Sequence, residues 1–286
     1  MDYKVLVTGS GGQLGSVLCA KMKNIFKLLP TSKNGNNNLH FQKLNITDID
    51  NVNKVIKSFS PDVIINTAAI TNVDDCETNK QLARSINVQG LNNLIKCSKF
   101  KVKIFQISTD YIFDGNTSPY NESSLPNPLN YYGKTKLEAE NILIGSNHKY
   151  IIIRISTLFN NYYNNFFTWV YNSLNNSDTI NVVHDQISNP SYVHSVCDAI
   201  IDMILLDGNG IYHYGCFDSI SRYDFAIKIA KKFNLNKNLI KKISTNELNQ
   251  IATRPLNTSF DCNKIKNTFD ITLYSVNDIM MQLNHA

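Results

Sequence analysis

Tyr132 and Lys136 are the residues of this chain whose types and spacing point most directly to chemistry. They stand four positions apart near the start of a predicted helix, 131–140, so their side chains lie on the same helix face. A tyrosine is a weak acid with an ordinary pKa of about 10, and a neighbouring ammonium group favours its charged form. The pair therefore has the chemistry to donate a proton to a carbonyl group that is being reduced.

The Tyr-x-x-x-Lys spacing alone is weak support for this chemistry. With 14 Tyr and 28 Lys plus Arg in 286 residues, about one Tyr-x-x-x-Lys/Arg spacing is expected by chance. The chain holds another, Tyr150 and Arg154, inside an apolar run that is predicted as a strand, 150–155. The elements around Tyr132 must therefore show whether it meets a cofactor.

A glycine-rich turn near the N-terminus predicts a site for a dinucleotide. An apolar strand, 4–8, runs into Gly9, Gly12 and Gly15, and a helical pattern follows. Glycines in such a turn let a pyrophosphate approach the backbone, and the positive end of the helix attracts it. A P-loop would carry Lys after its last glycine, where this chain has Ser16. We therefore predict that this turn binds a dinucleotide; the alternative is a turn that binds no ligand.

The residues after a second predicted strand, 26–30, indicate which dinucleotide. Thr31, Ser32 and Lys33 stand where an NAD-selective acidic residue is common. Hydroxyls and a cation can hold a 2′-phosphate that a carboxylate would repel, so NADPH is favoured, with NADH as the alternative. The other interpretation is an ordinary polar turn that leads into an Asn-rich loop, 34–38, and a short strand, 40–44.

Strands and helices alternate through the first half of the chain. Apolar strands are predicted at 63–69 and 103–111, and a helix is predicted at 81–99. This alternation predicts an α/β fold of the Rossmann type, with a doubly wound parallel sheet and a site at the carboxyl ends of the strands. Ser108 and Thr109 end one strand, so we expect their hydroxyls to face the same crevice as Tyr132.

The alternation stops near residue 157, which sets the predicted domain boundary. Short elements, aromatic residues and turn residues follow. We therefore expect an NADP-binding Rossmann domain over 1–156 and a smaller substrate-binding lobe over 157–286. An amphipathic helix, 196–206, is expected to return to the first domain.

Composition excludes several other classes of function. The formal charge of +5 is mild and the lysines are scattered, so nucleic-acid binding is not expected. No apolar run approaches the roughly 18 residues of a membrane span, and the chain opens into a strand without the pattern of a signal peptide. The six Cys and six His show no ligand spacing, so we expect no metal. Unpaired thiols fit a cytoplasmic location.

Further motifs stand in order along the chain. They are Asn66-Thr67-Ala68-Ala69, Asn87, 108–115, Tyr132-Gly133-Lys134-Thr135-Lys136, Arg154, Asn165-Phe166, Asp185-Gln186, Asn189-Pro190-Ser191 and Arg254-Pro255. With the glycine turn, this set resembles the extended short-chain dehydrogenase/reductase family, most closely its dTDP-4-dehydrorhamnose reductase (RmlD-like) branch. The resemblance covers nearly the full length.

The resemblance implies a role for each matching residue. Tyr132 would protonate a C4 keto oxygen, Lys136 would hold the nicotinamide ribose and lower the pKa of Tyr132, and Thr109 would hydrogen-bond the keto oxygen. The predicted cofactor contacts are Gly9, Gly12, Gln13, Leu14, Gly15, Ser32, Lys33, Asn45, Ile46, Ala68, Ala69, Ile70, Asn87, Tyr132 and Lys136. The predicted substrate contacts are Thr109, Asp110, Tyr111, Asn165, Gln186 and Arg254.

Two positions depart from the pattern of the branch. Asn45 replaces the usual Asp of the adenine-contacting pair, and Thr157 stands where a substrate-facing Trp is common. Because of Thr157, the identity of the sugar and of the nucleotide in the substrate is not predicted by the pattern of the branch.

The resemblance implies NADPH-dependent reduction of a nucleotide-linked 4-keto-6-deoxy sugar, with dTDP-4-dehydro-L-rhamnose as the leading substrate. One alternative is an epimerase/reductase that makes UDP-L-rhamnose. Another is a non-catalytic NADP-binding subunit, because 108–140 also resembles the regulatory β subunit of methionine adenosyltransferase. The implied partner is the nucleotide sugar, and a homodimer is a family-level expectation.

Overall fold

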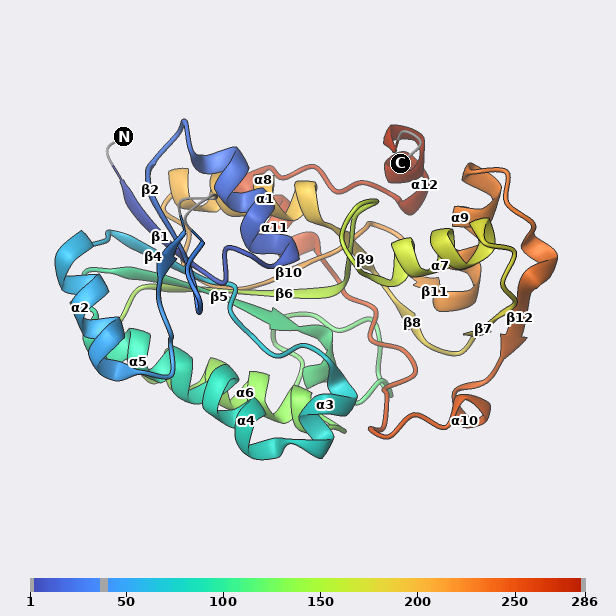
Figure 1. Ribbon diagram of the computed structural model, residues 1–286, viewed down its shortest axis with the longest axis horizontal. Helices are drawn as coiled ribbons and strands as arrows, with labels where there is room; N and C mark the ends of the chain where they lie inside the picture. The colour runs from blue at the N-terminus through green and yellow to red at the C-terminus, as the bar shows by residue number, and fades with distance from the viewer. Residues whose placement is uncertain (1–2, 37–40, 284–286) are drawn as a thin grey trace. The chain divides into compact units, whose positions relative to one another are not determined.

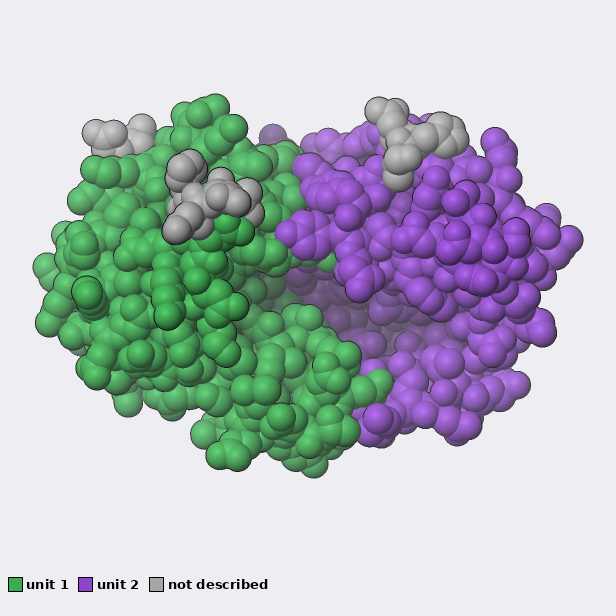
Figure 2. All heavy atoms as spheres, in the orientation of Figure 1, with its two compact units in different colours: residues 1–109, 130–154, 197–212 green, residues 110–129, 155–196, 213–286 purple. Residues whose placement is uncertain are grey.

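The computed structural model of the chain describes residues 3–36 and 41–283. The chain divides into two compact units, coloured green and purple in Figure 2. Unit 1 comprises residues 1–109, 130–154 and 197–212, and unit 2 comprises 110–129, 155–196 and 213–286. The segment 110–129 thus groups with unit 2, although it precedes the helix that carries Tyr132.

A large parallel sheet with helices on both faces confirms the predicted Rossmann-type architecture (Figure 1). Its strands follow the order β10-β6-β5-β4-β1-β2-β3, with β9 paired to β6. The bounds are β1 (Lys4–Thr8), β2 (Lys27–Ser32), β3 (Gln42–Lys43), β4 (Val63–Asn66), β5 (Lys103–Thr109), β6 (Tyr150–Phe159), β9 (Pro190–Tyr192) and β10 (Gly210–Tyr214). Strands β6 and β10 begin in unit 1 and end in unit 2. The pairs β1–β2, β1–β4, β2–β3 and β4–β5 are parallel.

Helices cover both faces of the unit 1 sheet. Their bounds are α1 (Gln13–Met22), α2 (Ile49–Phe59), α3 (Val73–Thr78), α4 (Lys80–Arg84), α5 (Gly90–Cys97) and α6 (Tyr131–Ile144), with α8 (Val193–Leu205) ending in this unit. Figure 1 shows α2, α5 and α6 below the sheet and α1 above it. All four residues of β4 are buried, as expected for a strand covered on both faces.

Several predicted bounds differ from the observed ones. The strand predicted at 63–69 ends at Asn66, and the strand predicted at 103–111 ends at Thr109 and continues as a 3₁₀ turn, Asp110–Ile112. The helix predicted at 81–99 is α4, a π-helical stretch (Ser85–Gln89) and α5. The predictions at 34–38 and 40–44 fall in part on residues 37–40, which lie outside the described residues.

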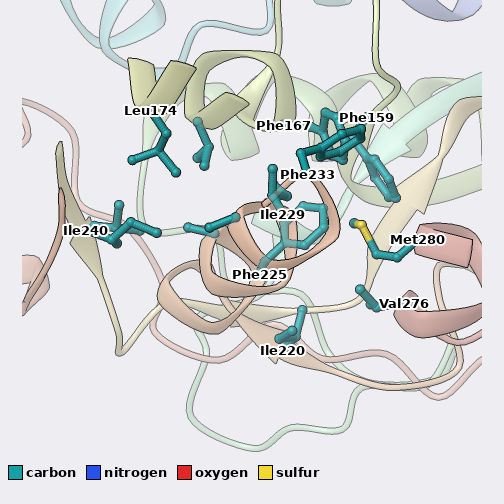
Figure 3. Close-up of a cluster of buried hydrophobic side chains, with 14 of the residues drawn as sticks. Phe159, Phe167, Leu174, Ile220, Phe225, Ile229, Phe233, Ile240, Val276 and Met280 are labelled. Carbon is teal, nitrogen blue, oxygen red and sulfur yellow. The ribbon is translucent and has the colours of Figure 1, made fainter. Parts of the chain in front are cut away.

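Unit 2 is built around its own apolar core (Figure 3). Phe159, Phe167, Phe225 and Ile229 are buried at its centre. The remaining elements are α7 (Phe166–Asn175), β7 (Ile180–Val183), β8 (Ile187–Ser188), β11 (Ile220–Ser221), α9 (Arg222–Lys232), β12 (Ile240–Ile243), α10 (Thr245–Leu248), α11 (Asn263–Phe269) and α12 (Val276–Gln282), with a 3₁₀ turn at Lys237–Leu239. Strand β12 pairs with β7 and β11 pairs with β8.

Two properties of the described ranges, 3–36 and 41–283, bear on other classes of function. No helix within them is long and apolar enough to cross a membrane. They hold no group of three or more His, Cys, Asp or Glu side chains with the geometry of a metal site.

Candidate functional site

The predicted cofactor turn is tightly folded against the end of β4. Gly9 has a φ of +69°, and a Cβ there would lie 2.8 Å from the backbone nitrogen of Ala68. A Cβ on Gly15 would lie 2.4 Å from the carbonyl oxygen of Gly9. Thr67 fixes this approach from the other side, because its hydroxyl donates a 2.6 Å hydrogen bond to the carbonyl of Thr8. Only glycine fits at both positions.

The first turn of α1 fits a pyrophosphate. Gly12 is its N-cap and makes no side-chain capping hydrogen bond. The Nε2 atom of Gln13 is buried and has no hydrogen-bond partner among the described residues. A helix N-terminus with an uncommitted amide donor suits an anion, because it offers N–H groups and partial positive charge. The predicted residues Gly12 to Gly15 thus present the donors that such a group needs.

At the end of β2, one buried hydroxyl residue is followed by two more accessible side chains. Thr31 is fully buried, and its hydroxyl donates a 2.9 Å hydrogen bond to the carbonyl of Val7. The side chain of Ser32 is half-buried and that of Lys33 is exposed. Ser32 and Lys33, the two predicted ligands of a 2′-phosphate, are therefore accessible where Thr31 is not.

The predicted adenine pair is shaped by local hydrogen bonds. The side-chain oxygen of Asn45 accepts hydrogen bonds from the backbone nitrogen and the hydroxyl of Thr47, at 3.2 and 2.9 Å. Ile46 is buried, and its carbonyl accepts a 2.9 Å hydrogen bond from Asn93. Gly90 gives Ile46 its space, because a Cβ on Gly90 would lie 2.4 Å from the Cδ1 atom of Ile46.

Asn87 connects the segment after β4 to the helix that carries Tyr132. It lies in the π-helical stretch and is buried. Its side chain accepts a 2.8 Å hydrogen bond from the nitrogen of Ile70 and donates to the carbonyl of Ile70 at 3.1 Å and to the hydroxyl of Thr135 at 3.0 Å. Asn87 thus positions the end of the predicted cofactor segment Ala68-Ala69-Ile70.

Helix α6 is fixed at its first turn by two side chains. The side chain of Asn130 accepts a 2.9 Å hydrogen bond from the nitrogen of Gly133. The carboxylate of Glu77, in the unpredicted helix α3, accepts one of 2.9 Å from the nitrogen of Tyr131. Negative charge at a helix N-terminus is stabilising. The start of the helix, and with it Tyr132, is therefore held from outside.

Tyr132 and Lys136 lie on the buried face of α6. Tyr132 is 8% exposed and Lys136 is 3% exposed. The Nζ atom of Lys136 donates a 2.6 Å hydrogen bond to the carbonyl of Ile107 in β5. Burial lowers the pKa of Lys136 to about 8, while the carboxylate of Glu140 acts in the opposite direction. The ammonium group is thus held at the strand that ends in Thr109.

Glu140 is a site residue that sequence reasoning did not single out. It forms a buried ion pair with Arg154 of β6, whose Nη2 donates to Oε2 at 2.7 Å and whose Nε donates to Oε1 at 3.1 Å. The available signal was spacing, because Glu140 stands four positions after Lys136 on the same helix face. The carboxylate therefore lies between two buried cations.

Strand β5 ends in two buried hydroxyl residues, Ser108 and Thr109. Ser108 is 2% exposed and Thr109 is 5% exposed. The hydroxyl of Ser108 has no hydrogen-bond partner among the described residues. Unit 1 thus contains the whole predicted cofactor set together with Thr109, Tyr132 and Lys136.

The other predicted substrate residues belong to unit 2. Asp110 is buried, and its Oδ2 atom accepts hydrogen bonds from the hydroxyls of Ser156 at 2.9 Å and Thr258 at 2.5 Å. Burial raises the pKa of Tyr111, and the positive charges of Arg222 and Arg254 act in the opposite direction. Arg222 was not among the predicted contacts; it directly follows Ser221, the N-cap of α9.

Asn165 and Gln186 already have several hydrogen-bond partners. The side-chain oxygen of Asn165 accepts from the nitrogens of Phe167 and Thr168 and so caps α7. Gln186 donates to Thr245 at 3.1 Å and to Gln250 at 3.0 Å. Their contact with a substrate stays a prediction.

A cavity of about 460 Å³ lies within unit 2. Arg254 lines it, and so do Thr245 and Gln250, the two partners of Gln186. Asp114 and Gly115 also line it. The volume is in the range of small-molecule sites.

The chain is similar in sequence and in structure to several known proteins. A dTDP-4-dehydrorhamnose reductase of Aggregatibacter actinomycetemcomitans is 38% identical over 284 residues, which cover 94% of each chain. The methionine adenosyltransferase 2 subunit beta of Xenopus tropicalis is 32% identical and covers 92% of this chain and 81% of its own. A crystal structure of dTDP-4-dehydrorhamnose reductase from Bacillus anthracis in complex with NADP superposes with a TM-score of 0.92 at 32% identity, covering 99% of this chain and 98% of that one.

The family model described as the RmlD substrate binding domain matches residues 3–283. The match therefore includes the glycine turn, α6 and the elements of unit 2 alike. This chain belongs to the RmlD substrate-binding-domain family, within the extended short-chain dehydrogenase/reductases.

Proposed function

We propose that the protein is an NADPH-dependent reductase that converts the C4 keto group of a nucleotide-linked 4-keto-6-deoxy sugar into a hydroxyl. The leading substrate is dTDP-4-dehydro-L-rhamnose, and the product is dTDP-L-rhamnose. This choice of substrate is supported by the similarity to two dTDP-4-dehydrorhamnose reductases. The observation that carries the proposal is the hydrogen bond from Lys136 to Ile107, because it holds a cation on the face of α6 that carries Tyr132.

In this reaction the reduced nicotinamide supplies a hydride to C4 when it is bound. The hydroxyl of Tyr132 donates its proton to the C4 oxygen, so the oxygen that gains negative charge becomes a hydroxyl group that stays bonded to C4. The ammonium group of Lys136 lies four residues away on the same face and stabilises the phenolate that remains. Thr109, at the end of β5, supplies a hydroxyl for the same oxygen.

The cofactor contacts follow from the donors of unit 1. The first turn of α1, with the amide of Gln13, would hold the pyrophosphate. Ser32 and Lys33 would hold the 2′-phosphate, which makes NADPH the preferred reductant. A structure of a relative in complex with NADP supports this choice. A cytoplasmic location and a homodimer complete the proposal.

A second candidate function is an NADP-binding regulatory subunit without turnover. The observation in its favour is the 32% identity to methionine adenosyltransferase 2 subunit beta. In that case the dinucleotide would be a structural ligand, and Tyr132 and Lys136 would be present without a substrate.

One assay separates the two candidates. Purified protein is mixed with NADPH and with a dTDP- or UDP-linked 4-keto-6-deoxy sugar, and oxidation is followed by loss of the absorbance of the reduced nicotinamide. We expect turnover with the dTDP sugar, and mass spectrometry of the product identifies the hydroxyl. Tight NADPH binding without oxidation by any such sugar would reject the reductase and favour the regulatory subunit.

A further inference from the structure

The proposed acid lies in the part of α6 that a helix holds least firmly. Tyr132 is the second residue of α6, directly after Tyr131. The backbone N–H groups of a first helical turn have no partners within the helix, and helix ends fray. Lys136 stands a full turn further on and is fixed to strand β5 by its 2.6 Å hydrogen bond to Ile107. The direction of the Tyr132 side chain therefore depends on what holds the residue before it.

Glu77 holds that residue from another element. Its Oε2 atom accepts a 2.9 Å hydrogen bond from the backbone nitrogen of Tyr131, 54 positions along the chain. Its Oε1 atom lies 3.0 Å from the ammonium nitrogen of Lys80. That nitrogen lies 5.5 Å from the centre of the Tyr131 ring. Tyr131 is thus held at its backbone by the carboxylate and contacted at its ring by the cation that the carboxylate binds.

An ordinary helix cap does not account for this hydrogen bond. Asn130 already caps α6, because its side chain accepts the 2.9 Å hydrogen bond from the nitrogen of Gly133. Glu77 serves a different donor, the N–H of the residue directly before Tyr132. The hydrogen bond from Tyr131, followed by the contact with Lys80, lowers the pKa of Glu77, so its carboxylate is charged at neutral pH.

Helix α3, which carries Glu77, also contacts the predicted cofactor segment. The residue before Glu77 is Cys76, which is fully buried, and its thiol donates a 3.6 Å hydrogen bond to the carbonyl of Ile70. Asn87 donates to the same carbonyl at 3.1 Å. Two neighbouring residues of α3 therefore hold the end of the cofactor segment and the backbone before Tyr132.

We propose that Glu77 is a positioning residue for the reduction, because its hold on the backbone of Tyr131 sets the direction in which the hydroxyl of Tyr132 points. This inference rests on the proposed function, in which Tyr132 donates the proton. Glu77 takes no proton in this role and acts only through the backbone. A hydroxyl at the far end of a tyrosine ring moves further than the backbone that carries it, and a misplacement of about 1 Å can lower a rate about 10²-fold.

Three substitutions separate the hydrogen bond from the charge. Glu77→Ala removes both carboxylate oxygens, Glu77→Asp keeps the charge with a shorter reach, and Glu77→Gln keeps an acceptor for the N–H of Tyr131 without the charge. Glu138→Ala is the matched control, because Glu138 also joins α6 to a neighbouring helix, through a 2.5 Å ion pair with Arg84 of α4. The control lies two turns away from the start of α6.

Each variant and the wild type are measured in the same way. Steady-state kinetics with NADPH and dTDP-4-dehydro-L-rhamnose give kcat and KM, and titration gives the affinity for NADPH. Hydrogen exchange, followed by mass spectrometry, reports the opening of the backbone amides of 131–133. Thermal unfolding shows which variants are folded; if Glu77→Ala is not, Glu77→Asp takes its place.

We expect Glu77→Ala to lower kcat about ten-fold or more, with the affinity for NADPH within about two-fold of the wild type. Glu77→Gln should recover most of the lost kcat, because its amide oxygen accepts the same hydrogen bond. The amides of 131–133 should exchange about ten-fold faster in Glu77→Ala than in the wild type. Glu138→Ala should match the wild type in kcat and in this exchange.

Three results would overturn the inference. A purely structural Glu77 would lower the unfolding temperature and leave the kcat of folded Glu77→Ala unchanged. Equal losses of kcat in Glu77→Ala and Glu77→Gln would show that the acceptor oxygen is not what matters. Unchanged exchange at 131–133 in Glu77→Ala would show that Glu77 does not hold the start of α6. If the wild type reduces no keto sugar, faster exchange in Glu77→Ala keeps the hold on Tyr131 and refutes only the reductase.

Discussion

The Nζ atom of Lys136 donates a 2.6 Å hydrogen bond to the carbonyl oxygen of Ile107, two residues before Thr109. This bond joins helix α6, which carries the predicted acid Tyr132, to strand β5, which ends in Thr109. One interaction therefore positions both residues. Lys136 is 3% exposed, and its ammonium therefore acts in a region of weak screening. The chemistry of Tyr132 should depend on this cation as much as on its own hydroxyl.

Tyr132→Phe removes the proton donor and leaves the ring. We expect turnover to fall about 10²–10⁴-fold, the usual contribution of a general acid, while NADPH affinity stays near that of the wild type. Tyr131→Phe is the matched control, because Tyr131 precedes the acid and its ring lies beside Lys80. Steady-state kinetics and NADPH fluorescence titration check the pair. Unchanged turnover in Tyr132→Phe would remove Tyr132 from the mechanism.

The pH dependence of turnover should follow the charge of Lys136. Burial lowers its pKa to about 8. Only the charged form stabilises the phenolate of Tyr132, so kcat/KM should fall as the pH rises through about 8. Lys136→Met should be slow at every pH and lack this fall. A wild-type profile that is flat to well above that pH would contradict the assignment.

The same pKa makes a prediction about stability. Between about 8 and the ordinary lysine value of about 10.4, the folded state binds fewer protons at Lys136 than the unfolded state. The contribution of Lys136 to the free energy of unfolding therefore increases as the pH rises from about 8 to about 10.4. The same contribution is lost as the pH falls back through about 8. Buried thiols such as Cys197, whose pKa is raised by burial, act in the opposite direction. The measurement is the difference in urea unfolding between the wild type and Lys136→Met at several pH values.

Local signals in the sequence were enough to predict the elements around the cofactor turn. The strand and glycine turn appear as β1 and the start of α1, and Tyr132 lies in the first turn of α6. The run with Tyr150 and Arg154 is strand β6, as expected from its apolar residues. These features depend on residues close in sequence, which is why a pattern can predict them.

Contacts between distant residues could not be predicted in this way. Helix α3 has six residues and no apolar period, so only its cap Asn72 marked it. The partner of Glu140 is Arg154, fourteen positions away in another element, and the pairing depends on how α6 packs on the sheet. The partners of Arg222 lie more than thirty positions away, at Phe166 and Gln186. Tertiary packing sets all three relationships.

Breaking the ion pair of Glu140 and Arg154 should lower the free energy of unfolding more than replacing both side chains with apolar ones. Both side chains are almost fully buried, at 1% and 3% exposure. Glu140→Gln leaves the Arg154 charge uncompensated, and we expect a loss of about 3–5 kcal/mol in the free energy of unfolding. The double variant Glu140→Leu/Arg154→Met should lose less than either single variant. Urea unfolding of the wild type, Glu140→Leu, Arg154→Met and the double variant gives the coupling, and additive losses would show that the pair does not act as a unit.

Gly15→Ala tests the close packing of the cofactor turn. The new Cβ would lie 2.4 Å from the carbonyl oxygen of Gly9 and 2.8 Å from the hydroxyl of Thr67, so the turn has to move. We expect a loss of about 1–3 kcal/mol in stability and a clear loss of NADPH affinity. Gly11→Ala is the control, because its Cβ would meet only the ring of Phe41 at 4.0 Å. Equal NADPH affinity of both variants would show that the turn does not shape the cofactor site.

Lys33→Ala tests the choice between the two dinucleotides. Lys33 is exposed at the end of β2, beside Ser32, and it is the cation predicted to bind the 2′-phosphate. A hydrogen bond to a charged group is worth about 1.5–3 kcal/mol, so we expect the KM for NADPH to rise about 10–100-fold. The KM for NADH should change little, because NADH has no phosphate at this position. Lys27→Ala, at the other end of the same strand, is the matched control. A long-range effect of charge alone would change the KM for NADPH equally in Lys33→Ala and Lys27→Ala. If Lys33→Ala leaves the ratio of the KM values for NADPH and NADH unchanged, Lys33 does not determine the selectivity between them.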